Sequence, residues 1–124
     1  MNELTSLVSV VDDDESVRES LPDLLAVLGY EVRAFASAEH FLASDCVTRT
    51  RCLIADIAMP GMTGPELQLE LRRRRQEIPT VFITAHRDLT VRPRLLAQGA
   101  VECLFKPFSE AALVAALTAA SPAA

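Results

Sequence analysis

The chain has 124 residues, 17 acidic and 12 basic, with a formal net charge of −5 and hydrophobic residues at half of its positions. This length predicts one domain with a core of its own, and the acidic balance argues against direct nucleic-acid binding. No apolar run approaches the ~20 residues that span a membrane, and no signal peptide is recognisable. Three cysteines without CxxC spacing indicate neither a disulfide framework nor a zinc site and predict a reducing, cytoplasmic location.

Five short apolar segments rich in β-formers predict strands. They are residues 7–11, 31–35, 52–55, 80–83 and 101–105. The residues around Val10, Ile54 and Val81 are almost all apolar, as in strands of a parallel sheet that are buried on both faces. The second segment alternates polar and apolar residues, so we expect it at an edge of the sheet.

Apolar residues at helical spacing lie between the predicted strands and after the last one. The first such stripe runs from Val17 to Leu28 and is closed by Gly29, and Ser37 can cap a short second helix. Pro22 lies inside the first stripe. Because proline lacks the N–H group that a helix interior needs, we expect a bend there.

The third helix is predicted to begin near Pro65, a residue suited to a first helical turn, and to end in the arginine run at residues 72–75. This run is interpreted as the solvated end of a helix, with a docking patch for an acidic partner as the alternative. Since Pro93 falls inside the fourth helix, that helix is expected to begin late, near Arg92, or to be distorted. Ser109 can cap the fifth helix.

Strand and helix thus alternate five times along the chain. This alternation predicts an α/β fold, a (βα)5 flavodoxin-like, doubly wound parallel sheet with strand order 2-1-3-4-5 and right-handed crossovers. Residues 1–120 are assigned to this single domain. The ending Ser-Pro-Ala-Ala at residues 121–124 is interpreted as a tail or as the start of a linker to an output domain.

Polar residues follow four of the predicted strands, where the ligand site of an open parallel sheet lies. They are Asp12, Asp13, Asp14, Asp56, Thr84 and Lys106. Clustered carboxylates repel one another, and a hard cation such as Mg²⁺ relieves the repulsion through oxygen ligands. A lysine and a hydroxyl suit phosphoryl oxygens, and an ionised aspartate can act as a nucleophile, so the set predicts phosphoryl transfer. Asp14 taken alone is better explained as a helix cap.

Four segments resemble the motifs of the response-regulator receiver family, and the resemblance extends from residue 7 to residue 117. Residues 10–14 are similar to its first acidic motif, and residues 56–64 to its phosphoacceptor loop. Residues 84–85 resemble its switch hydroxyl with the small residue that follows, and residues 106–108 its lysine motif. Residues 37–42, 83–88 and 99–102 are similar to the FixJ-type branch, whose members usually carry a C-terminal DNA-binding domain.

The resemblance implies that Asp56 accepts a phosphoryl group from a sensor histidine kinase. The implied ligands of Mg²⁺ are Asp12, Asp13, Asp56 and the backbone carbonyl of Ala58. The implied contacts to the phosphoryl oxygens are Thr84 and Lys106, and the peptide bond after Lys106 is expected to be cis. The chain would then be no enzyme beyond promoting its own phosphorylation and dephosphorylation. It would switch the surface of the fourth helix and fifth strand, and a phosphorylation-dependent homodimer is compatible with that role.

Two positions depart from the family's pattern. Cys103 stands where the family usually has a tyrosine or phenylalanine that moves with the switch threonine, and Pro93 interrupts the fourth helix. His86 is a candidate for influencing the loss of phosphate, with a solvent-facing loop histidine as the simpler interpretation. A stand-alone or phosphate-independent interaction module stays open as an alternative. An enzyme of the haloacid-dehalogenase type would use Asp12 as its nucleophile, but the sequence lacks the late acidic cluster that such enzymes need.

Overall fold

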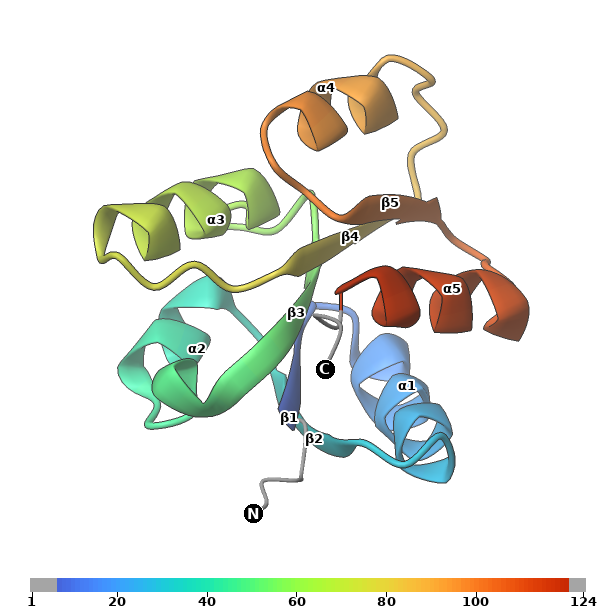
Figure 1. Ribbon diagram of the computed structural model, residues 1–124, viewed down its shortest axis with the longest axis horizontal. Coiled ribbons are helices and arrows are strands. Elements are labelled where there is room, and N and C mark those ends of the chain that lie inside the picture. The colour runs from blue at the N-terminus through green and yellow to red at the C-terminus, as the bar shows by residue number, and fades with distance from the viewer. Residues whose placement is uncertain (1–6, 121–124) are drawn as a thin grey trace.

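The computed structural model describes residues 7–120, and the expected tail at 121–124 lies outside the described residues. Five strands form one parallel sheet in the order β2-β1-β3-β4-β5 (Figure 1). Their bounds are β1 Leu7–Val11, β2 Glu31–Phe35, β3 Thr50–Asp56, β4 Thr80–Thr84 and β5 Glu102–Phe105. The predicted doubly wound fold is confirmed, and the alternating second strand lies at an edge as expected.

A helix follows each strand, on one or the other face of the sheet. The helices are α1 Glu15–Val27, α2 Ala38–Ala43, α3 Gly64–Arg73, α4 Val91–Ala97 and α5 Glu110–Ala120. Figure 1 shows α1 and α5 together on one face, and α2, α3 and α4 on the other. Within residues 7–120, no helix has the length and the hydrophobicity needed to cross a lipid bilayer.

The sheet separates two hydrophobic cores because neighbouring side chains of a strand point to opposite faces. On β1, Val10 packs into the core with Leu25 of α1, whereas Val11 packs into the core with Phe41 of α2 and Leu67 of α3. All five residues are fully buried. Apart from Arg51 near the start of β3, the residues of the inner strands are buried on both faces, which explains their nearly continuous apolar sequence.

Pro22 and Pro93, which were expected to disturb their helices, both lie within helices of the structure. α1 runs through Pro22 as one helix of 13 residues. α4 begins at Val91, one residue before the expected late start, so that Pro93 falls in the first turn. The first N–H groups of a helix have no partner within it, and a proline there loses no hydrogen bond.

The third strand begins earlier than predicted, at Thr50 rather than residue 52. The polar Thr50 at this start does not look like part of a buried strand, but its hydroxyl finds hydrogen-bond partners inside the fold. The hydroxyls of Ser9 and Thr50 are joined by a hydrogen bond of 2.8 Å, and Thr50 also donates to the carbonyl of Cys46 at 2.7 Å. A short 3-10 turn, Val47–Arg49, precedes this strand and was not predicted.

The arginine run at residues 72–75 is exposed at the end of α3, in agreement with a solvated helix end. Arg73 and Arg74 both donate to the carboxylate of Glu70, at 2.7 to 2.9 Å. Arg72 donates instead to the carbonyl of Gln98 at 3.0 Å, just beyond α4. The run therefore contributes to local pairing and to the contact between α3 and α4.

Candidate functional site

The polar residues predicted to follow the strands meet at the carboxyl edge of the sheet. Asp12 follows β1, and the register of β1 with β3 places it beside Asp56, the last residue of β3. Thr84 ends β4, and its carbonyl accepts a hydrogen bond of 2.7 Å from the backbone N–H of Lys106, just after β5. Strand order and register together thus bring into one place residues that lie up to 94 positions apart.

Three carboxylates form a compact acidic cluster at this edge. Asp12, Asp13 and Asp56 each offer an oxygen atom, and these atoms lie within 4.8 Å of one another. Asp12 is fully buried and Asp56 is 8% exposed, whereas Asp13 is exposed at the rim. A set of oxygen donors without histidine or cysteine suits a hard cation such as Mg²⁺.

Lys106 supplies the positive charge of the site. Its ammonium Nζ donates to Asp12 Oδ2 at 2.9 Å and to Asp56 Oδ2 at 3.3 Å, and its side chain is 18% exposed. Burial raises the pKa of the Asp12 carboxyl above its ordinary value, against the opposing effect of the Lys106 hydrogen bond. Burial disfavours the charged form of Lys106, but the hydrogen bond and the charge of Asp12, with those of Asp56, raise its pKa overall. The ammonium therefore stays charged at neutral pH and offsets one of the three carboxylates.

The loop after β3 is packed tightly against Asp56. Asp56 Oδ1 accepts a hydrogen bond of 3.1 Å from the backbone N–H of Ala58. The N–H of Gly64, at the start of α3, donates to the carbonyl of Ile57 at 3.2 Å. A Cβ atom at Gly64 would collide with the carbonyl oxygen of Asp56, so only glycine permits this close approach.

Asp14 and Arg18 have structural roles next to the acidic cluster. Asp14 Oδ1 accepts from the backbone N–H of Ser16 at 2.9 Å and from its hydroxyl at 2.8 Å, which caps α1 and lowers the pKa of Asp14. The helix-cap interpretation of Asp14 is thereby confirmed. Arg18 donates to the backbone carbonyl of Asp12 at 3.0 Å. The contact of Arg18 could not be predicted from the sequence, because an arginine on a helix usually points to solvent.

Thr84 presents a buried hydroxyl group next to the acidic cluster. Its Oγ1 accepts a hydrogen bond of 3.0 Å from the backbone N–H of His86, and its own hydroxyl hydrogen is free to donate to another group. The side chain of His86 is exposed, in agreement with a solvent-facing loop histidine. Cys103 is buried in the core beneath α4, and the peptide bond between Lys106 and Pro107 is cis as expected.

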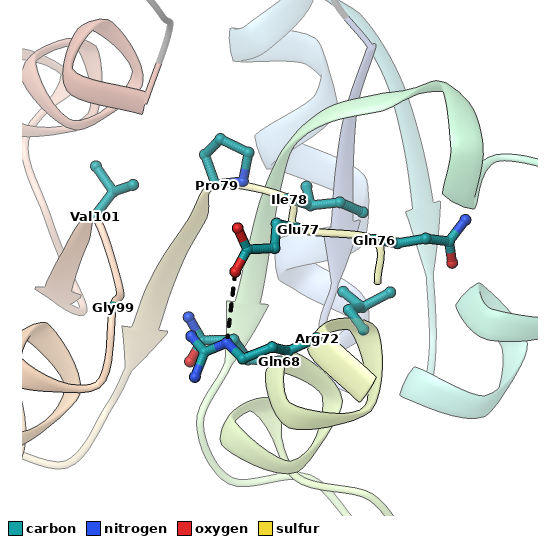
Figure 2. A pocket seen from close by; sticks show the side chains of 9 residues that line it. Gln68, Arg72, Gln76, Glu77, Ile78, Pro79, Gly99 and Val101 are labelled. Atoms are coloured by element: carbon teal, nitrogen blue, oxygen red, sulfur yellow. Dashed lines mark ion pairs between the residues drawn. The ribbon is translucent and has the colours of Figure 1, made fainter. Parts of the chain in front are cut away.

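A cavity of about 400 Å³ lies at the opposite end of the sheet from the acidic cluster. Its lining comes from α3 and from the segments that lead into β4 and β5, as the positions of Gln68, Pro79 and Val101 in Figure 2 show. An ion pair of 3.9 Å joins Arg72 and Glu77, two of its lining residues. Because the ligand site of a parallel sheet lies at the carboxyl ends of the strands, the acidic cluster and not this cavity is the candidate site.

A five-stranded parallel sheet with three carboxylates, a hydroxyl and a lysine at its carboxyl edge defines a receiver-like signalling domain. Residues 8–118 match the family model for the response regulator receiver domain. The chain belongs to this family of two-component signalling proteins.

Similar proteins agree with this assignment and point to the FixJ-like branch. Nodulation protein W of Bradyrhizobium diazoefficiens is 42% identical over 94% of this chain and 51% of its own length. Transcriptional regulatory protein FixJ of Rhizobium meliloti is 38% identical, over 92% of this chain and 56% of its own. The chain therefore spans about half the length of the curated relatives that it matches.

Solved structures give the same result. The response regulator StyR is 46% identical, with a TM-score of 0.83 over 92% of this chain and 58% of that one. The structure of FixJ-N is 36% identical, with a TM-score of 0.82 over 93% of this chain and 92% of that one. The family model and the solved structures thus agree on the fold and the family.

Proposed function

We propose that this domain is a phosphorylation switch in which Asp56 accepts a phosphoryl group from the phosphohistidine of a sensor kinase. The observation that carries the proposal is the surroundings of Asp56. Its carboxylate shares a site of 4.8 Å span with those of Asp12 and Asp13, and lies 3.3 Å from the ammonium of Lys106. Such a site combines a nucleophile with the charges that phosphoryl transfer needs.

The donor set of the site fits Mg²⁺. The carboxylates of Asp12, Asp13 and Asp56 would hold the ion, together with the backbone carbonyl of Ala58, an exposed residue of the adjacent loop. When bound, Mg²⁺ supplies positive charge that offsets the carboxylates and the incoming phosphoryl oxygens. The buried Asp12 binds a cation best in its ionised form, which the neighbouring Lys106 ammonium favours.

In the transfer step, a carboxylate oxygen of Asp56 forms a bond to phosphorus while the phosphorus–nitrogen bond of the phosphohistidine breaks. The imidazole nitrogen keeps the electron pair of that bond. The ammonium of Lys106 turns from Asp56 Oδ2 to a phosphoryl oxygen, and the hydroxyl of Thr84 donates to another. The chain's own contribution is to position the nucleophile and to neutralise charge, with no further substrate, so it is not an enzyme in the usual sense.

Phosphorylation would be relayed through the surface formed by α4 and β5. Thr84 leads directly into the loop before α4, so a movement of its hydroxyl towards the phosphoryl group displaces that loop. Arg92 at the start of α4 pairs with Glu102 of β5 at 2.7 and 3.0 Å, which joins the two elements of this surface. Cys103 contributes a small buried side chain there instead of an aromatic ring.

The regulated output is a C-terminal DNA-binding domain outside this sequence, with a homodimer as the phosphorylated state. Support comes from the relatives, which are about twice as long as the matched region and include proteins named transcriptional regulators. The net charge of −5 supports the view that DNA contacts belong to that other domain. The place of action would be the cytoplasm, where sensor kinases present their phosphohistidines.

Phosphorylation by a small phosphodonor tests the proposal. The chain is incubated with acetyl phosphate and Mg²⁺, and its intact mass is measured beside that of Asp56→Asn and of the control Asp14→Asn, which keeps a helix cap. We expect one phosphoryl group on the wild type and the control, none on Asp56→Asn, and none after chelation of Mg²⁺. If neither the wild type nor the control gains mass, the phosphate-independent module is the correct interpretation.

A further inference from the structure

The loop between Asp56 and α3 is held from outside by a carboxylate of α2. Glu39 Oε2 accepts a hydrogen bond of 3.1 Å from the backbone N–H of Met62. The same oxygen lies against Gly61, where an added Cβ atom would approach it to 2.8 Å. Glu39 thus contacts two consecutive residues of a loop that is 23 positions away in the sequence.

The other hydrogen bonds of the loop, residues 58–63, are local. Ala58 is held by Asp56 and Thr63 by the capping box of α3, so both bonds stay within the adjoining elements. Among the described residues, the bond from Met62 to Glu39 is the only hydrogen bond that joins residues 58–63 to any element other than β3 and α3. Apart from side-chain packing, the loop is therefore joined to α2 at this one point.

The loop needs such a restraint because of its backbone. Gly61 has φ of +74°, a left-handed conformation that glycine adopts without strain but also leaves easily. Met59 is buried and Met62 half-buried in the core that includes Phe41 of α2. Between these anchors, the carboxylate of Glu39 fixes the turn at Gly61 and, through it, the course of the chain back to Ala58.

A simpler role for Glu39 is to stabilise α2 itself. It lies in the first turn of that helix, where a negative charge interacts favourably with the helix dipole. That role requires neither the hydrogen bond to Met62 nor the contact over Gly61. Glu39 is exposed and forms no ion pair among residues 7–120, so its one recorded side-chain partner is the loop.

We propose that Glu39 is a positioning residue for the phosphoacceptor loop, which it holds so that the Ala58 carbonyl faces the metal site before the ion arrives. The inference rests on the proposed function of Asp56. A loop that is already in place loses less conformational entropy when Mg²⁺ binds, so the tether lowers the Mg²⁺ concentration that phosphorylation requires. The maximal rate, set by Asp56 and Lys106, depends on it less.

The test compares three variants with the wild type. Glu39→Ala removes the acceptor, and Glu39→Gln keeps an acceptor oxygen without the charge. Glu19→Ala removes an exposed glutamate of α1 whose side chain has no hydrogen-bond or ion-pair partner within residues 7–120. The rate of labelling by acetyl phosphate is measured over a range of Mg²⁺ concentrations, and Tm is measured in parallel. We expect Glu39→Ala to need about tenfold more Mg²⁺ for half-maximal rate, the size typical of lost outer-sphere support for a metal site. Glu39→Gln and Glu19→Ala should behave as the wild type.

Each other outcome overturns the inference in a recognisable way. An unchanged Mg²⁺ dependence in Glu39→Ala refutes it while the proposed function stands. Equal defects in Glu39→Ala and Glu39→Gln assign the effect to charge and not to the hydrogen bond. A defect that appears only together with a lowered Tm assigns Glu39 to the stability of α2. If the wild type is not labelled at all, the proposed function fails first and the inference with it.

Discussion

Replacement of Lys106 by methionine should destabilise the domain, and a second replacement at Asp12 should restore part of the loss. Methionine keeps much of the aliphatic volume but removes the ammonium that donates to Asp12 and Asp56. Asp12 is then left fully buried without a counter-charge. Asp12→Asn in the same chain removes that buried charge, so the double variant should be more stable than Lys106→Met alone.

The magnitude follows from the geometry of the pair. At the 2.9 Å separation of Lys106 Nζ and Asp12 Oδ2, two unit charges attract by about 6 kcal/mol at an effective dielectric constant of about 20. The cost of removing both groups from water offsets part of this attraction. Close, largely buried charge pairs retain roughly 1.5 to 7 kcal/mol in double-mutant cycles. We expect a coupling free energy of about 2 to 3 kcal/mol at neutral pH.

Urea denaturation of the wild type, both single variants and the double variant provides the measurement. The unfolding is followed in the presence of a chelator, so that no divalent cation substitutes for the ammonium. The coupling free energy is the sum of the two single losses of stability minus the loss in the double variant. A coupling below about 0.5 kcal/mol, typical of exposed pairs, would contradict the view that Lys106 and Asp12 stabilise each other as a buried pair.

Further predictions concern packing, pH and reactivity. Gly64→Ala should lower the free energy of unfolding by about 1 to 3 kcal/mol in urea and slow the labelling of Asp56, because the new Cβ collides with the Asp56 carbonyl oxygen. Hydrogen bonds from Arg73 and Arg74 lower the pKa of Glu70 from 4.5 to about 2. Its contribution to stability is thus present above pH 4.5 and lost as the pH falls towards 2, so Glu70→Gln should flatten the dependence of Tm on pH in that window. Burial raises the pKa of Cys52 to about 12, and peptide mapping after iodoacetamide treatment at about pH 8 should find Cys52 unmodified until the domain unfolds.

Much of the fold was predictable because a parallel sheet imposes simple rules on sequence. Strands buried on both faces, such as the one around Ile54, must be mostly apolar, and each is followed by a helix that covers one face. The strand order then determines which strand ends are neighbours. Asp12 and Asp56 could therefore be placed side by side before any coordinates were known.

The remaining details depend on contacts that local patterns do not reveal. The start of β3 at Thr50 requires the buried partner Ser9, which lies 41 positions away. Pro93 predicted a late start or a distortion of α4. Which of the two occurs depends on where the helix begins, and the sequence does not mark that residue. The tether from Glu39 to the loop joins two elements through an exposed side chain, and no periodicity marks it. Such contacts join residues that are distant in the sequence, so they become visible only in the folded structure.

The most direct test of the central claim is the identity of the residue that carries the phosphoryl group. Chain labelled by acetyl phosphate in the presence of Mg²⁺ is treated with borohydride, which reduces an aspartyl phosphate to homoserine, and the peptides are sequenced by mass spectrometry. The account predicts homoserine at position 56 alone. Homoserine at position 12, the nucleophile of the alternative dehalogenase-type mechanism, or no conversion at any aspartate would contradict it.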